Sequence, residues 1–425
     1  MIRFLTRQRS ICLTLGIFAA CLVSCDRGTS SESRGPVTLR FWNGFTGPDG
    51  RTMLAIVKQF NAANPDVHVR MQRMEWGTYY NKLFVAALGE RAPEVFVLHT
   101  DSIPSFRAAG FLRESDDMAI DSSDFDENVW QSVQFDGKHY AIPLDMHLIG
   151  MFYNRTLFKA AGIDKPPTNR AEFLDACRKL TRETDSSNRQ WGFIFTWQRT
   201  NIYTLFRQWG GDIFNDDGTR CTIDSPACAA ALQFAVDLIF KEKVAPSPAT
   251  VNNAFIGFRQ GNIGMLFEGI YMLPELKRQT DLDWGAAPVP QLGDQKAAWC
   301  NSHNLCLRSD LTGRELEAAQ RFVKYLSDHS LDWAEGGQVP VRKSLRDSER
   351  FQSMTAQREF AKQIPYAAYM PRVMFVGEYL IEYEAGIERA LRGSIPPEQA
   401  LREARERIEK IIQRSNDSTG KADAP

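Results

Sequence analysis

Between residues 37 and 98, segments with the apolar spacing of a β-strand alternate with segments that have the apolar spacing of a helix. Three segments read as β-strands, because they are apolar at every second position or continuously: residues 37–42, 67–74 and 95–98. The intervening segments have helical spacing, with Met53, Ile56, Val57 and Phe60 in the first and residues 79–88 as the second. Thr46 and Asp49 are placed as a capping box for the first helix. Strands that alternate with helices predict a doubly wound α/β sheet with parallel pairing.

The ends of these strands predict where a ligand binds. The carboxyl ends of parallel strands meet at one edge of a sheet. We therefore expect three short segments to face one crevice: Asn43 to Thr46, Glu75 with Trp76, and His99 to Asp101. Gly44, Gly47 and Gly50 follow the first strand, but no Lys-Ser or Lys-Thr pair follows them and no Gly-x-Gly begins them. The spacing matches neither phosphate-binding loop. We expect these glycines to let the turn approach the crevice closely.

A second series of strands and helices begins after residue 145. Strands are predicted at residues 148–154, 191–197, 262–269 and 304–307, and helices at residues 171–181, 228–240, 314–328 and 397–414. In the last helix Ala400, Leu401, Ala404, Ile408 and Ile411 share one face, which predicts packing on a lobe. Residues 415–425 are expected to form a disordered tail. The pattern predicts a second α/β lobe.

The first 24 residues differ from the rest of the chain. Arg3, Arg7 and Arg9 precede an apolar run, which is typical of a secretory signal peptide. Leu22-Val23-Ser24-Cys25 resembles the bacterial lipobox, which implies cleavage before Cys25 and acylation of that residue. An ordinary signal peptide with a chance cysteine is the alternative. Asp26 resembles a signal for retention on the inner membrane, and residues 25–36 then form a polar, flexible tether.

Composition and motifs exclude several classes of function. The 425 residues carry a formal net charge of -1, so no basic surface for nucleic acid is predicted. No Gly-x-Ser-x-Gly or His-Glu-x-x-His motif occurs, and the six histidines are scattered. An exported hydrolase is therefore a remote alternative, and neither a cofactor nor a metal is expected. Five cysteines remain beyond Cys25, so at least one is unpaired, and Cys221 and Cys228 are close enough in sequence for a small disulfide loop.

Several blocks of sequence, in order, resemble one family. "LRFWNGFTGPDG", "EWGTYYNKL", "DGKHYAIPLDMHLIGMFYNRTLFKAAGI" and "FRQGNIGMLFEGIYM" are similar to successive blocks of the family 1 extracellular solute-binding proteins, the group that includes maltose-binding protein. The resemblance covers nearly all of residues 37–412. It implies a receptor for an ABC importer with a two-lobed, type II-like periplasmic-binding-protein fold. The lobes would be joined by three crossovers and would close on a ligand by a hinge.

The resemblance also implies domain boundaries, partners and a location. Residues 37–145 with 290–328 would form the first lobe, and residues 146–289 with 329–414 the second. The expected partners are a saccharide, the permease subunits of the importer, and the membrane through a lipid anchor. The protein would be exported, monomeric and held on the outer face of the cytoplasmic membrane.

The blocks that match also imply the ligand-binding residues. They are Asn43, Thr46, Trp76, Tyr80, Thr100, Asp101, Asp145, His147, Trp197, Gln198, Tyr203, Glu268, Tyr271, Trp299, Ser302 and His303. Aromatic faces cover the apolar faces of sugar rings, while carboxylates and amides bond to hydroxyl groups. Asp101 has an alternative role as a helix cap, and His147 and His303 as ordinary polar residues.

Two other ligands remain open on the same fold. Acidic and aromatic residues together also suit a polyamine, through cation–π contacts. A glycerol phosphate ester would require Arg199, Arg207 or Arg372 to turn toward the ligand.

Overall fold

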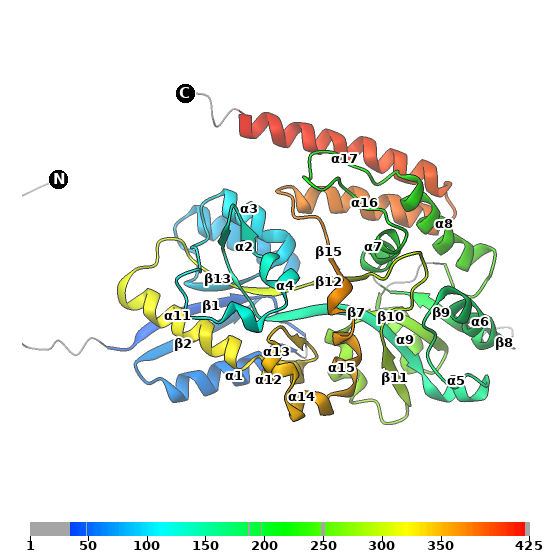
Figure 1. Ribbon diagram of the computed structural model, residues 1–425, viewed down its shortest axis with the longest axis horizontal. Coiled ribbons are helices and arrows are strands. Elements are labelled where there is room, and N and C mark those ends of the chain that lie inside the picture. Colours follow the sequence, from blue (N-terminus) through cyan, green and yellow to red (C-terminus); the bar gives the residue numbers. More distant parts are fainter. Residues whose placement is uncertain (1–34, 48, 186–187, 197, 248–250, 421–425) are drawn as a thin grey trace, which may run out of the picture. The chain divides into compact units, whose positions relative to one another are not determined.

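The computed structural model describes residues 35–420 except 48, 186–187, 197 and 248–250. The signal peptide, Cys25 and nearly all of the tether lie outside the described residues. From Pro36 onward the chain forms one unit, built on two sheets (Figure 1). Within the described residues, no helix has the length and apolar character needed to cross a membrane.

The first sheet has the strand order β2-β1-β3-β13-β6. Its strands are β1 (Val37–Asn43), β2 (Val67–Arg73), β3 (Val95–His99), β6 (Ile142–Pro143) and β13 (His303–Leu307). β1 pairs with β2 and β3 in parallel, as the alternating pattern predicts, whereas β13 is antiparallel to β3 and β6. The sheet is therefore mixed, because β13, which comes from a distant part of the chain, runs antiparallel to both of its neighbours.

Helices cover both faces of the first sheet. The helices of this region are α1 (Asp49–Ala63), α2 (Trp76–Leu88), α3 (Ile103–Ala108), α4 (Glu127–Gln131), α11 (Gly313–Asp328) and α12 (Ser330–Trp333), beside a hairpin of β4 (Gln134–Phe135) and β5 (Lys138–His139). Alternate residues of β3 point to opposite sides. Val97 joins the core with α1 and α11, whereas Phe96 joins the core with α2 and α3.

The second sheet has the order β15-β12-β7-β10-β9-β8, and β11 and β14 also pair with β7. Its strands are β7 (Asp145–Asn154), β8 (Arg182–Asp185), β9 (Asn188–Phe195), β10 (Ile263–Gly269), β11 (Trp284–Ala287), β12 (Ala298–Asn301), β14 (Val339–Pro340) and β15 (Ala367–Tyr369). The long strand β7 runs through the middle of this sheet (Figure 1).

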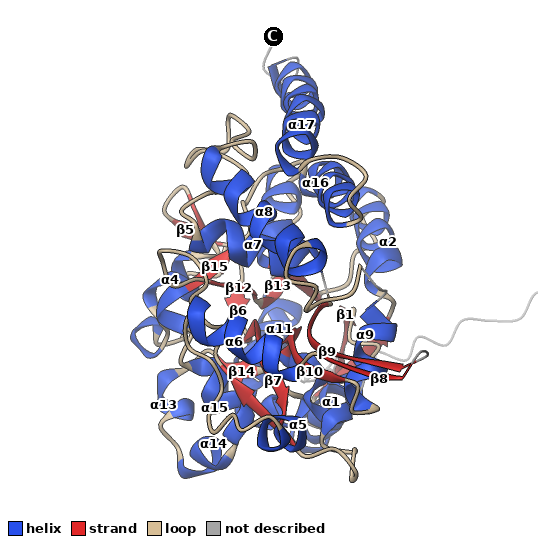
Figure 2. Ribbon diagram, turned by 90° about the vertical axis from the view of Figure 1, so that its right-hand side faces the viewer, coloured by secondary structure: helices blue, strands red, loops and turns tan. Residues whose placement is uncertain are grey.

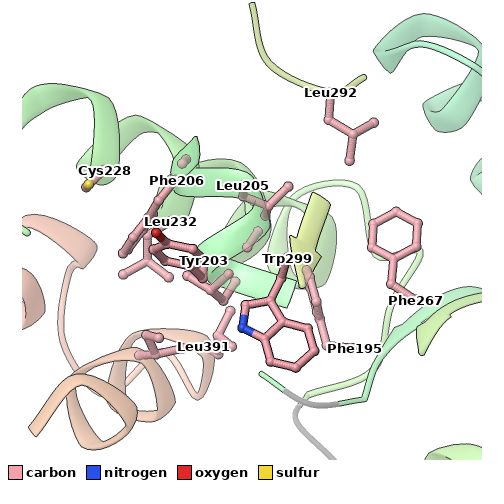
Figure 3. Close-up of a cluster of buried hydrophobic side chains, with 14 of the residues drawn as sticks. Phe195, Tyr203, Leu205, Phe206, Cys228, Leu232, Phe267, Leu292, Trp299 and Leu391 are labelled. Atoms are coloured by element: carbon pink, nitrogen blue, oxygen red, sulfur yellow. The ribbon is translucent and has the colours of Figure 1, made fainter. Parts of the chain in front are cut away.

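The helices of the second sheet enclose two more cores. They are α5 (Arg155–Ala160), α6 (Arg170–Leu180), α7 (Gln198–Gln208), α8 (Pro226–Phe240), α9 (Val251–Arg259), α10 (Leu273–Leu276), α13 (Lys343–Arg346), α14 (Glu349–Ser353), α15 (Thr355–Ala361), α16 (Val376–Leu391) and α17 (Pro397–Gly420). Figure 3 shows part of the larger core, where Tyr203 and Phe206 of α7, Leu232 of α8 and Trp299 come together. Short 3-10 turns lie at Thr100–Ser102, Ser122–Asp124, Ile270–Met272, Ala334–Gly336 and Ile364–Tyr366.

The chain passes between the two sheets three times: at two neighbouring points, and again between β13 of the first sheet and β14, which pairs with β7 of the second. Leu144 lies between β6 of the first sheet and β7 of the second, and Ser302 lies between β12 of the second sheet and β13 of the first. The backbone N–H of Leu144 donates to the carbonyl oxygen of His303 at 2.9 Å. The return to the first sheet therefore occurs at Ser302 rather than near Pro290, because β12 pairs with β7 and β15.

Helices α16 and α17 lie side by side (Figure 1, Figure 2). The apolar face predicted for the last helix is buried, including Ala400, Leu401 and Ile408. The helix does not stop before residue 415, as the expected tail required, but continues to Gly420. No proline or glycine interrupts residues 415–419, so the backbone of the preceding helix can continue through them.

The five cysteines of the described part of the chain are free and buried. Cys221 and Cys228 do not form the small disulfide loop that their spacing allows. Burial raises the pKa of each of these two thiols to about 12, so both are poor nucleophiles at neutral pH.

Candidate functional site

A cavity of about 710 Å³ lies where the strand ends of the two sheets meet. The first sheet contributes the turn after β1, the start of α2 and the end of β3. The second sheet contributes β7, the start of α7, the turn after β10 and β12, and residues 370–380 complete the wall. The lining residues are Gly44, Thr46, Gly47, Asp49, Glu75, Trp76, Gly77, Tyr80, Asn81, Phe84, His99, Asp101, Ser102, Ser105, Phe106, His147, Ile149, Arg199, Thr200, Gly269, Tyr271, Trp299, Asn301, His303, Gln338, Met370, Met374, Val376, Gly377 and Leu380.

Half of the sixteen residues expected to bind ligand line this cavity. They are Thr46, Trp76, Tyr80, Asp101, His147, Tyr271, Trp299 and His303. Seven others do not line it: Asn43, Thr100, Asp145, Gln198, Tyr203, Glu268 and Ser302. Trp197 lies outside the described residues. The seven residues are close in sequence to the cavity, but most of their side chains are used to hold the strand ends in place.

Asn43 and Thr100 support the loops after β1 and β3. The side-chain oxygen of Asn43 accepts a hydrogen bond from the backbone N–H of Phe45 at 3.3 Å. The hydroxyl oxygen of Thr100 accepts one from the side chain of Asn304 at 3.1 Å. Both side chains are fully or almost fully buried, so neither is available to a ligand.

Asp145 and Ser302 fasten the two crossing points together. The hydroxyl of Ser302 donates to the carbonyl oxygen of Asp145 at 2.5 Å. The Asp145 carboxylate is paired with Nδ1 of His303 at 2.8 Å and accepts from Nε1 of Trp333 at 2.6 Å. Burial opposes ionisation of Asp145, but the charge and hydrogen bonds of His303 and the Trp333 bond outweigh burial and lower its pKa. Both residues are structural parts of the crossing rather than cavity walls.

Tyr203, Gln198 and Glu268 are placed behind the wall of the second sheet. The Tyr203 hydroxyl donates to the carbonyl oxygen of Tyr369 at 2.8 Å, and the ring lies in the core shown in Figure 3. Gln198 begins α7 but does not line the cavity, whereas the next residue, Arg199, does. Glu268 is fully buried, and its Oε1 accepts from the Tyr271 hydroxyl at 2.6 Å. Burial raises the pKa of Glu268 to about 7.

An aromatic cluster forms the wall on the first-sheet side. The Trp76 ring stacks on Tyr80, with 5.7 Å between ring centroids and 26° between ring planes. A Cβ atom on Gly44 would lie 2.1 Å from Cδ2 of Trp76, so only glycine allows this approach. This agrees with the expected role of the first glycine. The helix after it begins later than Thr46, at Asp49, and Thr46 is left to face the cavity.

Charged groups line the same cavity. Asp101 accepts a hydrogen bond from Asn301 Nδ2 at 3.2 Å, and burial raises its pKa. Asp101 is not the cap of the following helix, since Ser102 is the N-cap residue of α3. Arg199 forms an ion pair with Glu384 at 3.2 Å. Of the three arginines considered for a phosphate ligand, Arg199 lines the cavity and the other two do not.

Three of the six histidines meet at the cavity, although their sequence positions are scattered. His303 is directly opposite His99 in the β13–β3 ladder, and His147 is opposite Asn301 in the β12–β7 ladder. Ligand atoms of the three rings lie within 4.8 Å of one another. Burial, then the neighbouring His303, lowers the pKa of His99 well below its usual value and that of His147 to about 3. This cluster contradicts the expectation that the histidines are too dispersed to meet.

Sequence analysis missed several lining residues. They are Asp49, His99, Arg199, Asn301, Gln338 and the group from Met370 to Leu380. His99 directly follows the strand predicted at residues 95–98, and its segment was expected to face the crevice, but no ligand-binding role was expected of it. The residues of α16 carried a signal in Tyr379, Tyr383, Ile387 and Leu391, which are buried at helical spacing.

The chain is similar in sequence and in fold to several known proteins. The profile of the family described as bacterial extracellular solute-binding protein matches residues 45–330. The chain is 22% identical to the maltotriose-binding protein of Pyrococcus abyssi, over 83% of this chain and 77% of that one. It is 25% identical to the diacetylchitobiose-binding protein DasA of Streptomyces coelicolor, over 74% of each. The GacH receptor of Streptomyces glaucescens, solved unliganded and with acarbose, has the same fold, with a TM-score of 0.79 at 22% identity over 89% of this chain and 99% of that one.

Proposed function

Because the chain belongs to the bacterial extracellular solute-binding proteins, we propose that it is the receptor of an ABC importer and captures a sugar or oligosaccharide for the permease. The cavity is the observation that carries this proposal. Its volume of about 710 Å³ is within the usual range of roughly 300–1,000 Å³ for small-molecule sites. The relatives named above as binding maltotriose and diacetylchitobiose support the saccharide class.

The chemistry of the walls supports a saccharide further. Trp76 and Tyr80 present aromatic faces on the first-sheet side, and Tyr271 and Trp299 on the second-sheet side. Such faces suit the apolar C–H faces of sugar rings. Asp101 and Asn301 bond to each other there and offer further acceptors and donors to hydroxyl groups. A neutral ligand is also suitable because Arg199 already has a carboxylate partner, Glu384.

Ligand capture by closure follows from the placement of these walls. The two sheets are joined by neighbouring crossings at Leu144 and Ser302. We take these as the hinge, with residues 37–143 and 303–328 in the first lobe and most of the remaining described chain in the second. A sugar that contacts both walls favours the closed form by its difference in affinity for the two forms.

A ligand screen tests the proposed function. Purified protein is heated with monosaccharides, oligosaccharides, spermidine and glycerol phosphate, and hits are titrated by calorimetry. A saccharide is expected to raise the midpoint of unfolding, since it binds only the folded state. If only glycerol phosphate or only spermidine raised the midpoint of unfolding, the ligand would belong to that class of compound and not to the saccharides. No response to any saccharide would contradict the proposal.

We also propose that the ligand is released chemically unchanged. Members of this family are described as binding proteins, and no catalytic motif was found in the sequence. Incubation of the best sugar with a stoichiometric amount of protein, followed by mass analysis of the sugar, should return the intact compound.

Export and anchoring are proposed from the leader sequence. The family is extracellular by its description, which supports secretion. We infer that Cys25 is acylated and holds the protein, as a monomer, on the outer face of the cytoplasmic membrane. Mass spectrometry of the N-terminal peptide from the native host is expected to show a lipid-modified Cys25. An unmodified terminus beyond Cys25 would contradict the anchor.

A further inference from the structure

We propose that His99, His147 and His303 form a binding site for a divalent transition-metal ion such as Zn²⁺. The three side chains converge on one point at the cavity, with their candidate ligand atoms within 4.8 Å of one another. A tetrahedral zinc ion bound at 2.0–2.1 Å holds its nitrogen ligands about 3.3 Å apart. The rings therefore need to approach by at most about 1.5 Å, which side-chain rotation can supply.

Two of the rings are already oriented as metal ligands. Nδ1 of His303 is paired with the Asp145 carboxylate at 2.8 Å, and Nδ1 of His99 with the Tyr80 hydroxyl at 2.6 Å. A metal-binding histidine commonly donates its other ring N–H to a carboxylate or another oxygen, which fixes the ring and directs the free nitrogen to the metal. This arrangement leaves Nε2 of both rings for an ion.

The third ring has no other polar role in the described structure. Both ring nitrogens of His147 are inaccessible to solvent and have no hydrogen-bond partner. A buried polar atom without a partner is costly, and a metal ion would satisfy it. His147 contacts the other two rings, at centroid distances of 6.3 Å to His99 and 5.3 Å to His303.

The charges around the cluster are compatible with a cation. Asp145 is in contact with His303, and Asp49 and Asp101 line the same cavity. Arg199 also lines the cavity, and its charge acts on His99 and His147, but it is paired with Glu384. Three imidazole ligands favour zinc, nickel or copper over magnesium or calcium. Because the cluster lines the cavity, the fourth coordination position would face the ligand space, as in zinc sites with three protein ligands.

The site would also join the two sheets. His99 and His303 belong to the first sheet and His147 to the second. An ion held by all three would therefore hold the crossing segments together. This proposal does not rest on the sugar-binding function, because metal binding is measured without sugar.

A metal titration tests the proposal. Purified full-length protein is freed of metal with a chelator and titrated with Zn²⁺ against a chromophoric competitor, and separately with Co²⁺ while the visible spectrum is recorded. We expect one equivalent of each ion to bind, and Co²⁺ to show the intense visible bands of a tetrahedral site. His147→Ala should weaken Zn²⁺ binding by more than about 100-fold, since loss of an outer partner alone costs about 10- to 100-fold.

Two further variants make the result specific. His68 is exposed on β2, so His68→Ala is a matched control that should bind Zn²⁺ like the wild type. Tyr80→Phe removes only the hydroxyl that orients His99 and should weaken binding about 10-fold while the Co²⁺ bands persist. Circular dichroism confirms that each variant is folded. Absence of Zn²⁺ binding by the wild type, or equal binding by His147→Ala, would show that the rings are an aromatic wall only.

Discussion

At the scale of single residues, Gly44 controls the position of the main aromatic ring of the first wall. A Cβ atom there would lie 2.1 Å from the Trp76 ring. We expect Gly44→Ala to displace Trp76, to lower the free energy of unfolding by about 1–3 kcal/mol as overpacking does, and to weaken sugar binding. Denaturant unfolding and calorimetry measure these effects. Gly35→Ala is the control, because a Cβ there meets nothing within 4 Å. Unchanged sugar affinity in Gly44→Ala would show that the position of Trp76 does not matter for sugar binding.

Glu268 makes stability depend on pH through a single buried carboxyl group. Burial raises its pKa from 4.5 to about 7, so the native state holds this proton more tightly than the unfolded state. The resulting stabilisation is complete below pH 4.5 and is lost as the pH rises through about 7. The difference between the two pKa values corresponds to about 3 kcal/mol.

Glu268→Gln should remove this dependence. We expect the variant to gain roughly 2–3 kcal/mol relative to the wild type between pH 5 and pH 8. Unfolding in urea at both pH values measures the gain, with the exposed Glu406→Gln as the control. An equal difference between variant and wild type at both pH values would show that Glu268 does not titrate in this range.

At the scale of elements, α17 supports α16, which in turn forms part of the cavity wall. Leu401 of α17 is fully buried in the same core as Tyr383 and Ile387 of α16. We expect Leu401→Ala to lower the free energy of unfolding by about 2–5 kcal/mol through the cavity it leaves. The exposed Glu406→Ala on the same helix should change it by no more than about 0.5 kcal/mol. Equal unfolding curves for the two variants would mean that the packing of α17 on this core does not contribute to the free energy of unfolding.

The elements near the N-terminus are predictable from the sequence because their apolar periods are local. Residues 37–42, 67–74 and 95–98 became β1, β2 and β3 with small changes in their ends. The sequence did not predict that β12 belongs to the second sheet, because its pairing with β7 joins residues that are distant in sequence. The same limit applies to Glu268, whose strand end was recognised while its rotation away from the cavity was not.

The histidine cluster shows the same limit at the level of the site. His99, His147 and His303 are separated by long stretches of sequence, and only the ladders of β3, β7, β12 and β13 bring them together. A motif search detects ligands at fixed spacing along one segment. It has no means of detecting ligands that three separate strands bring to one place.

At the scale of the whole molecule, ligand binding should be coupled to closure. Asp101 belongs to the first-sheet side of the cavity, and loss of a charged hydrogen bond costs about 1.5–3 kcal/mol. Asp101→Ala should therefore weaken sugar binding about 10- to 100-fold. Small-angle scattering should show compaction of the wild type with sugar, and of the variant only at higher sugar concentrations. Asp164→Ala, an exposed site, is the control. Compaction of Asp101→Ala at the wild-type sugar concentration would exclude Asp101 from the site.

The neighbouring crossings at Leu144 and Ser302, as the axis of rotation between the lobes, should set the order in which residues contact the sugar. His147 and Asn301 lie within three residues of a crossing, so rotation about that axis displaces them little. Leu380 and Phe84 belong to α16 and α2 rather than to the strands that form the crossings, so we expect them to meet the ligand only after rotation. A sugar would thus be recognised first by residues near the axis and retained afterwards by residues at the outer walls. Substitutions near the axis should slow association, whereas substitutions on the outer walls should shorten the lifetime of the complex.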